Sequence, residues 1–138
     1  YTADPSEEAL LAVYNPKGIT IGVGAFLPDG NQEKVLFGFT VRYKRNEQIK
    51  GKFIMFDRNT RDIFVARSFE WMVIKDKKAY LSGDLKINGQ GSYPFMAIVE
   101  DNGSPGKNKD KFSIDIVVDG NHIIYDEVIS NGNIIVCK

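Results

Sequence analysis

The clearest pattern in the chain is an alternation of apolar and polar residues with a period of two, the spacing that sends successive side chains to opposite faces of a β-strand. It is plainest in VLFGFTVRYK, residues 35–44. One face of this segment carries apolar residues, namely Val35, Phe37, Phe39, Val41 and Tyr43. The other face carries Gly38, Thr40, Arg42 and Lys44. The alternation predicts a strand with one buried and one solvated face.

Similar segments recur, separated by dipeptides in which glycine follows aspartate or asparagine. Five such dipeptides occur, and they tolerate the positive φ of tight hairpin turns. Further strands are expected at Gly18–Leu27, Gly51–Asp57, Ile63–Lys75 (broken or bent), 77–87, Ser92–Glu100, Lys111–Asp119, His122–Val128 and Asn133–Cys137. About eight to ten short antiparallel strands without a long helical pattern predict an all-β chain, folded as an antiparallel β-sandwich or a flattened barrel.

The start of the chain has a different character. In DPSEEALLAVY, a capping residue, an early proline and two acids precede alanines and leucines, which favours a short helix. The alternative is that Ala9–Tyr14 is extended and packs as a docking strand, on its own domain or on a neighbouring copy. The chain therefore divides into an N-terminal segment, residues 1–17, and a β-domain, residues 18–138.

Composition narrows the classes of function. Lysine and arginine together number 18, as do aspartate and glutamate, so the formal net charge is zero. This balance argues against a nucleic-acid binder and against a membrane-surface module. No apolar run approaches the roughly 18 residues of a membrane span. The only cysteine, Cys137, excludes an internal disulfide, and its alternation with Ile135 predicts a buried thiol.

The stretch DKFSIDIVVDGNHIIYDE, Asp110 to Glu127, holds the only histidine beside several acids. With Asp119-Gly120 at the centre of a hairpin turn, Ile116 faces Ile123 and Ile114 faces Tyr125. Asp115 then lies diagonal to His122 on the opposite face. No nucleophile-elbow pattern marks a serine or cysteine nearby, so this stretch is interpreted as a solvated hairpin rather than a catalytic site.

Other enzyme signatures are missing from the sequence. Zinc sites need several histidines or cysteines, and the chain has one of each. Neither a phosphate-binding P-loop nor a dinucleotide-binding glycine motif leading into a helix is present. Paired carboxylates, Asp57 with Asp62 or Glu100 with Asp101, leave a glycosidase-type hydrolase as the least favoured alternative. No catalytic residue is assigned, and the chain is expected not to be an enzyme.

A calcium site is the main candidate for a bound cofactor. Glu100, Asp101, Asn102 and Asp110 bracket one loop, and their oxygens converge if the flanking strands are neighbours. Asp101, Asn102 and Asp110 are the proposed ligands. The alternative is that these side chains cap turns by bonding to the backbone.

Aromatic residues from Phe53 to Phe95 invite two interpretations. An exposed row would make a stacking platform for sugar, whereas a buried set would fill the core of the sandwich. Trp71 shares its position in the alternation with Phe69 and Val73, which predicts that it is mostly buried.

The order of several motifs resembles a known family. These motifs are FGFTVRYK (37–44), RSFEWMVIKDKKAYLSGDLKINGQGSYPFMAIVED (67–101), DKFSIDIVVDGNHIIYDE (110–127) and NGNIIVCK (131–138). Together they are similar to the C-terminal extracellular β-domain of secreted bacterial and archaeal surface proteins, sometimes called the post-COAP type, over roughly residues 18 to 138. The loop acids Asp101 and Asp110 match the family pattern. Ala25-Phe26, Ser113 and Glu127 depart from it.

The resemblance implies a secreted module at the cell surface, without catalytic residues and with no firmly assigned ligand. From all of this we expect a non-catalytic extracellular structural or adhesion module, a candidate subunit of a surface assembly. Its partners would be other surface proteins or its own copies, through strand donation by residues 9–14. The alternative from another class is a carbohydrate-binding module. Neither nucleic-acid binding nor membrane insertion is expected.

Overall fold

The computed structural model describes residues 17–138, which form nine β-strands and no helix. The strands are β1 (Ile19–Phe26), β2 (Val35–Tyr43), β3 (Ile49–Asp57), β4 (Asp62–Lys75), β5 (Lys78–Ile87), β6 (Gln90–Glu100), β7 (Lys111–Val118), β8 (Asn121–Val128) and β9 (Asn131–Cys137). Within these residues no helix is long and apolar enough to cross a membrane. The helix or docking strand expected in the N-terminal segment, including residues 9–14, lies outside the described residues.

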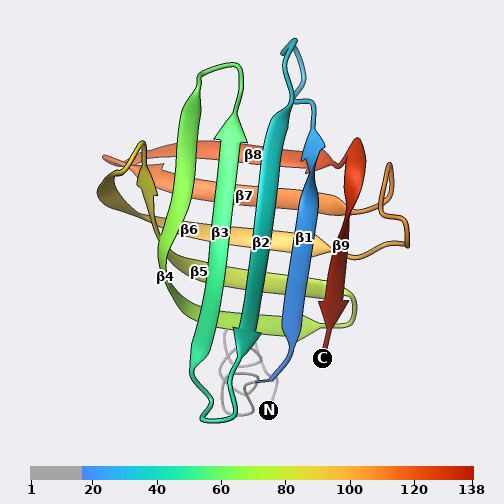
Figure 1. The fold of residues 1–138 in the computed structure, drawn as a ribbon. Coiled ribbons are helices and arrows are strands. Elements are labelled where there is room, and N and C mark those ends of the chain that lie inside the picture. The colour runs from blue at the N-terminus through green and yellow to red at the C-terminus, as the bar shows by residue number, and fades with distance from the viewer. Residues whose placement is uncertain (1–16) are drawn as a thin grey trace, which may run out of the picture.

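All nine strands belong to one antiparallel sheet in the order β8-β7-β6-β5-β4-β3-β2-β1-β9. The first eight strands follow one another as a meander, and β9 returns to pair with β1. Figure 1 shows the sheet folded over on itself, with β3, β2, β1 and β9 upright in a front layer and β5 to β8 crossing behind them. The prediction of an all-β antiparallel sandwich or flattened barrel is confirmed.

Strand β4 carries the sheet from the front layer into the rear layer. Its first residues pair with β3, and its later residues pair only with β5, with register shifts at Ala66/Ser68 and Phe69/Trp71. Such bulges bend a strand and increase its twist. Beyond both register shifts, the Tyr43 hydroxyl of β2 accepts a hydrogen bond from the Met72 amide and donates one to the Met72 carbonyl, each at 2.9 Å. The break or bend expected in Ile63–Lys75 is therefore present.

Seven phenylalanine rings lie in the core between the layers. The ring of Phe112 on β7 lies 4.7 Å from that of Phe37 on β2 and 5.5 Å from that of Phe26 on β1, measured between centroids. Every strand except β8 places fully buried side chains in this core. At Gly22 an added Cβ would collide with the ring of Phe39, so glycine makes room there for an inward aromatic side chain.

Two predicted orientations were wrong. Trp71 was expected in the core, but Met72 and Ile74 are buried instead, and Trp71 is half-buried on the outer face of the rear layer. The reason is the bulge: Phe69 pairs with Gly83 and Trp71 with Ser82, so the extra residue Glu70 inverts the alternation. Cys137 is exposed rather than buried. Apolar residues occupy both faces of β9, so its alternation does not identify the inner face.

Candidate functional site

A continuous aliphatic surface covers the outer side of the front layer. Seven side chains form it, each between 40% and 65% exposed: Ile21, Val23, Leu36, Ile54, Ile63, Val65 and Ile135. We call this set the aliphatic face. It contains most of the large exposed apolar side chains found in residues 17–138. Large contiguous apolar patches mark contact surfaces in soluble proteins, whereas single exposed apolar residues do not.

Strand register places these side chains beside one another. Val23 on β1 pairs with Gly38 on β2, which pairs with Ile54 on β3, which pairs with Val65 on β4. A parallel row runs through Leu36, Phe56 and Ile63, and a third joins Ile135 to Ile21. An added Cβ at Gly38 would have only one heavy atom within 4 Å, a methyl carbon of Ile54 at 3.9 Å. Gly38 therefore leaves an open dip at the centre of the face.

The sequence of these strands explains why both of their faces are apolar. Short runs without any polar residue occur in β3 (FIMF, 53–56), β4 (IFV, 63–65) and β9 (IIV, 134–136). Strands that are covered on both faces have such continuous runs, whereas strands with one wet face alternate. The described residues cover only the inner face of these strands. The run pattern was the available signal for this surface, and alternation alone does not reveal it.

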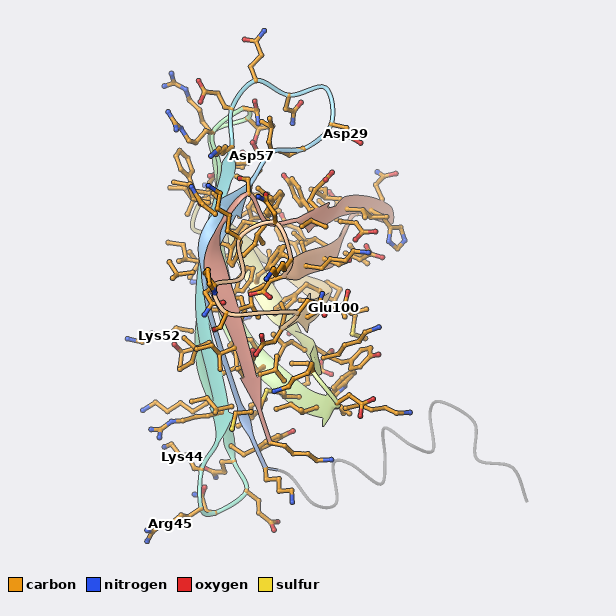
Figure 2. All side chains as sticks on the ribbon, turned by 90° about the vertical axis from the view of Figure 1, so that its right-hand side faces the viewer. Asp29, Lys44, Arg45, Lys52, Asp57 and Glu100 are labelled. Carbon is orange, nitrogen blue, oxygen red and sulfur yellow. The ribbon has the colours of Figure 1, made fainter. Side chains whose placement is uncertain are left out.

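Basic residues border the lower end of the aliphatic face. Arg42 pairs with Ile19 and Lys50, and Thr40 pairs with Lys52, so Arg42, Lys50 and Lys52 project from the same outer side. All three are exposed, and none forms an ion pair with another described residue. Figure 2 shows Lys52 pointing away from the front layer, with Lys44 and Arg45 at its lower end. The surface is therefore apolar over its centre and positively charged at one end.

The loop after β6 brings together the three residues proposed as calcium ligands. Asp110 is fully buried, and its Oδ1 accepts a hydrogen bond from the Asn102 amide at 2.7 Å. Its Oδ2 accepts one from the Ile134 amide on β9, also at 2.7 Å. Asp101 Oδ2 accepts from the Val136 amide at 3.2 Å, and the Asn102 side chain donates to the Lys109 carbonyl at 3.0 Å. Two acids of this loop therefore satisfy backbone donors on the free edge of β9.

This arrangement uses the loop acids as acceptors for backbone N–H groups. Across residues 17–138 no three histidine, cysteine, aspartate or glutamate side chains gather as ligands for a metal ion. Carboxylates that accept hydrogen bonds from backbone N–H groups match the alternative in which these side chains cap turns. Calcium binding by Asp101, Asn102 and Asp110 stays a prediction.

The carboxylate pairs considered for a glycosidase-type hydrolase form hydrogen bonds and ion pairs with other groups of the protein. Asp57 and Asp62 lie opposite each other on β3 and β4. Asp57 is buried; its Oδ1 accepts from the amide and side chain of Asn59, at 2.8 and 3.1 Å, and its Oδ2 accepts from the Tyr125 hydroxyl at 2.7 Å. Glu100 pairs with Lys78 at 3.4 Å, while its neighbour Asp101 faces β9.

Hydrogen bonding sets the protonation of the Asp57–Tyr125 pair. Burial alone would raise the pKa of Asp57, but hydrogen bonds from Tyr125, Asn59 and Thr60 outweigh it and hold that pKa below its ordinary value. Burial, followed by the bond to Asp57, raises the pKa of Tyr125. The carboxylate thus stays charged and the phenol stays a donor, which links β3 in the front layer to β8 at the rear edge.

The hairpin formed by β7 and β8 has the predicted register. Val118 pairs with Asn121, Ile116 with Ile123 and Ile114 with Tyr125. Although Asp115 and His122 are diagonal, their side chains meet, with His122 Nδ1 2.7 Å from Asp115 Oδ1. Both side chains are about half exposed, and no described serine, threonine or cysteine is hydrogen-bonded to them.

The outer face of the rear layer carries two partly exposed aromatic side chains, Trp71 and Tyr80. Trp71 pairs with Ser82 and Tyr80 pairs with Val73, so Trp71 and Tyr80 are diagonal neighbours on β4 and β5. Both are half-buried. Next to Tyr80 lies a pocket of about 330 Å³, lined by Lys75, Asp76, Lys77, Lys78, Tyr80, Glu100 and Asn102.

Comparisons of this chain with protein-family models, with curated proteins and with solved structures found no match.

Proposed function

We propose that this chain is a non-catalytic structural module that packs through its aliphatic face against a second copy of itself in a surface assembly. The observation that carries the proposal is the contiguity of seven exposed aliphatic side chains over five neighbouring strands. Burying such a surface is favourable by about 25 cal/mol per Å² of apolar area, which is the main driving force of protein association.

Several other features support a structural role. Asp57, Asp101 and Asp110 accept hydrogen bonds that hold β9, the loop after β6 and the two layers together. The carboxylates with the most unusual surroundings therefore stabilise the fold. His122 and Asp115 are about half exposed, which fits their interpretation as a solvated pair on a hairpin.

An extracellular location and the family assignment are parts of the same proposal. They are supported by the order of the motifs between residues 37 and 138, which resembles the post-COAP type of surface-protein domain. Cell-surface modules of this kind connect or present other domains. A face that binds a second copy would let the module connect neighbouring chains.

The proposal is tested by changing the charge of the face in the full chain. Val23 and Ile54 are replaced together by lysine, and Ile124→Lys on the rear layer serves as the matched control, because Ile124 is 63% exposed and Val23 is 65% exposed. Sedimentation velocity over a range of concentrations measures self-association. We expect the double variant to associate at least about tenfold more weakly than wild type, since burying two unpaired ammonium groups is costly.

The control variant should associate as wild type does. Self-association of equal strength in all three proteins would reject the aliphatic face as the contact surface. A monomeric wild-type chain at every concentration would reject assembly between copies.

Carbohydrate binding is the second candidate function, favoured by the position of Trp71 and Tyr80 on one outer face beside a pocket. Stacking of sugar rings uses flat aromatic side chains with an accessible face. Trp71 is the only tryptophan, so its fluorescence reports on this surface alone. Titration with a soluble β-linked glucan hexasaccharide should shift the emission in wild type and not in Tyr80→Ala if sugar binds there. No spectral change would remove this candidate for that glycan.

A further inference from the structure

We propose that the free edge of β8 binds an extended basic segment of a partner protein as an additional antiparallel strand. The inference goes beyond the proposed function and does not rest on it. β8 stands at one end of the strand order, so only one of its two edges is paired, with β7. A strand at the edge of a sheet presents a row of N–H and C=O groups that can pair with another chain.

The register of the β7–β8 hairpin identifies the backbone groups on this edge. Val118 and Asn121 flank the two-residue turn and are hydrogen-bonded to each other, after which bonded and non-bonded pairs alternate along the ladder. The bond from the Ile129 amide to the Asp110 carbonyl, at 2.9 Å, continues the same alternation beyond the strand. The groups that point away from β7 therefore belong to His122, Ile124, Asp126 and Val128.

These outward backbone groups have no hydrogen-bond partner within residues 17–138. The other end of the sheet differs, because the outward amides of Ile134 and Val136 on β9 donate to the carboxylates of two loop acids. β8 also pairs with β7 without a register shift and contains no proline, whereas bulges and prolines are common means of protecting an edge. Among the described residues, one edge of the sheet is capped and the other is open.

The position of the front layer favours an extended partner over a folded one. Figure 1 shows the front strands β2 and β3 continuing above β8. Two β8 edges in an antiparallel pair would be related by a twofold axis perpendicular to the sheet, so both front layers would lie on the same side and their ends would overlap. A single extended segment needs only the spacing of one more strand, about 4.8 Å. The edge therefore fits an extended segment better than a second copy.

The hairpin is acidic, which favours a basic segment. Residues 111–128 contain one lysine and four acids, a net charge of −3 with histidine neutral, whereas the formal charge of the whole chain is zero. Lys111 offsets only one of these acids, through its contact with Asp126 at 3.1 Å. Lysines on the outer side of an added strand would lie near the remaining acids, and opposite charges on neighbouring strands attract.

The two sides of the edge also differ in polarity. On the inner side, Ile123 and Tyr125 pack against the core and leave an apolar border for small apolar side chains. On the outer side, Ile124 is 63% exposed beside the charged residues, where the alkyl stem of a lysine can lie over it while the ammonium group stays in water. A segment in which lysine alternates with a residue such as valine fits both sides.

Hydrogen exchange of single amides in the full chain, followed by NMR, tests the inference. The probe is an acetylated and amidated octapeptide of alternating lysine and valine, and its matched control alternates glutamate with valine. In the free chain we expect slow exchange at Ile123 and Tyr125, which are bonded to β7, and fast exchange at Ile124 and Asp126. The lysine peptide, at about ten times its dissociation constant, should slow Ile124 and Asp126 about tenfold. The glutamate peptide should leave both unchanged.

Backbone variants separate strand addition from simple charge attraction. In an antiparallel pair, the peptide residues that are bonded to β8 carry their side chains on the outer side, as Ile124 does. N-methylation of the lysines should therefore abolish binding, whereas N-methylation of the valines should preserve it. In the protein, Ile124→Pro removes one outward N–H, which an edge strand tolerates, and Ile124→Thr keeps it. The proline variant should bind the lysine peptide at least about tenfold more weakly than the threonine variant.

Four results would overturn the inference. Slow exchange at Ile124 and Asp126 in dilute, peptide-free samples would show that the edge is already paired. Slowing that appears only as the protein concentration rises would assign the edge to a second copy. Equal binding of the lysine and glutamate peptides, or of the two N-methylated peptides, would remove the basic segment or the added strand, respectively. The methylated peptides decide the question on the wild-type chain, even if Ile124→Pro does not fold.

Discussion

The carboxylate of Asp110 accepts a hydrogen bond from the backbone amide of Ile134 at 2.7 Å, across 24 positions of the chain. This bond fastens the loop after β6 to β9, the strand that ends the sheet beside β1. The other oxygen of Asp110 accepts a hydrogen bond from the Asn102 amide within the loop. A buried acid here joins the rear layer to the free edge of the front layer.

Replacing Asp110 by alanine should therefore destabilise the fold. The buried N–H group of Ile134 would lose its acceptor, which costs about 1–3 kcal/mol, and the partly buried bond from the Asn102 amide would be lost as well, so we expect a decrease of about 2–4 kcal/mol in the free energy of unfolding. Asp115→Ala is the matched control, because Asp115 is about half exposed; it should change stability by about 0.5 kcal/mol or less. Urea unfolding followed by circular dichroism measures both. Equal effects would contradict the role given to Asp110.

Calcium should leave stability unchanged if the Asp110 carboxylate serves only backbone donors. Both of its oxygens already accept amide hydrogen bonds, with which a cation at the same oxygens would compete. Thermal melts in millimolar calcium and in chelator should therefore coincide. A higher melting temperature in calcium would instead support Asp101, Asn102 and Asp110 as ligands, since a bound ion stabilises the folded state by mass action.

The Asp57–Tyr125 hydrogen bond predicts a loss of stability in acid. The pKa of Asp57 lies below its ordinary value of 3.8 in the folded chain, so the unfolded chain binds the proton more readily. The contribution of Asp57 is fully present above pH 3.8 and is lost as the pH falls through the lower pKa of the folded state.

Tyr125→Phe removes one donor while burial, which raises the pKa of Asp57, remains. We expect that pKa to rise and the acid-induced loss of stability to begin at a higher pH than in wild type. Carboxyl-carbon NMR titration of Asp57 measures the change in its pKa. Urea unfolding at pH values between about 2 and about 7 measures the loss of stability in acid. Tyr80→Phe is the control, because Tyr80 lies on the outer face of the rear layer. An unchanged Asp57 titration in Tyr125→Phe would contradict the account.

Trp71 and Phe112 should differ in their importance for stability. Phe112 is fully buried among other aromatic rings, so truncation to alanine should cost about 3–5 kcal/mol. Trp71 is half-buried on the outer face, and its truncation should cost clearly less. The folded protein should show a tryptophan emission maximum between those of buried and fully hydrated indole. A cost for Trp71→Ala equal to that for Phe112→Ala would place the indole in the core after all.

Local patterns in the sequence predicted much of the fold. Alternation and Asp-Gly or Asn-Gly turns indicated an all-β antiparallel chain, and the register of the β7–β8 hairpin followed from Asp119-Gly120, whose φ angles are both positive. Trp71 was misplaced because a bulge inserts Glu70 and inverts the alternation. That bulge is tied to the corner between the layers and to the Tyr43 hydroxyl on another strand, so local pattern does not reveal it.

The candidate site was harder to predict than the fold. The buried state of Asp110 depends on Ile134, a residue on a strand that reaches it only through the folded topology. The aliphatic face did leave a signal, in the polar-free runs of β3, β4 and β9. Those runs show that both faces of a strand are apolar, but which side chains remain uncovered depends on how the sheet curls.

The most direct test of the central claim, that the aliphatic face is a contact surface between copies, is a methyl NMR spectrum of the full chain at increasing protein concentration. The account predicts concentration-dependent shifts or broadening at Ile21, Val23, Ile54 and Val65, with Met96 and Ile124 on the rear layer unchanged. Spectra that do not change with concentration, or changes confined to Met96 and Ile124, would contradict it.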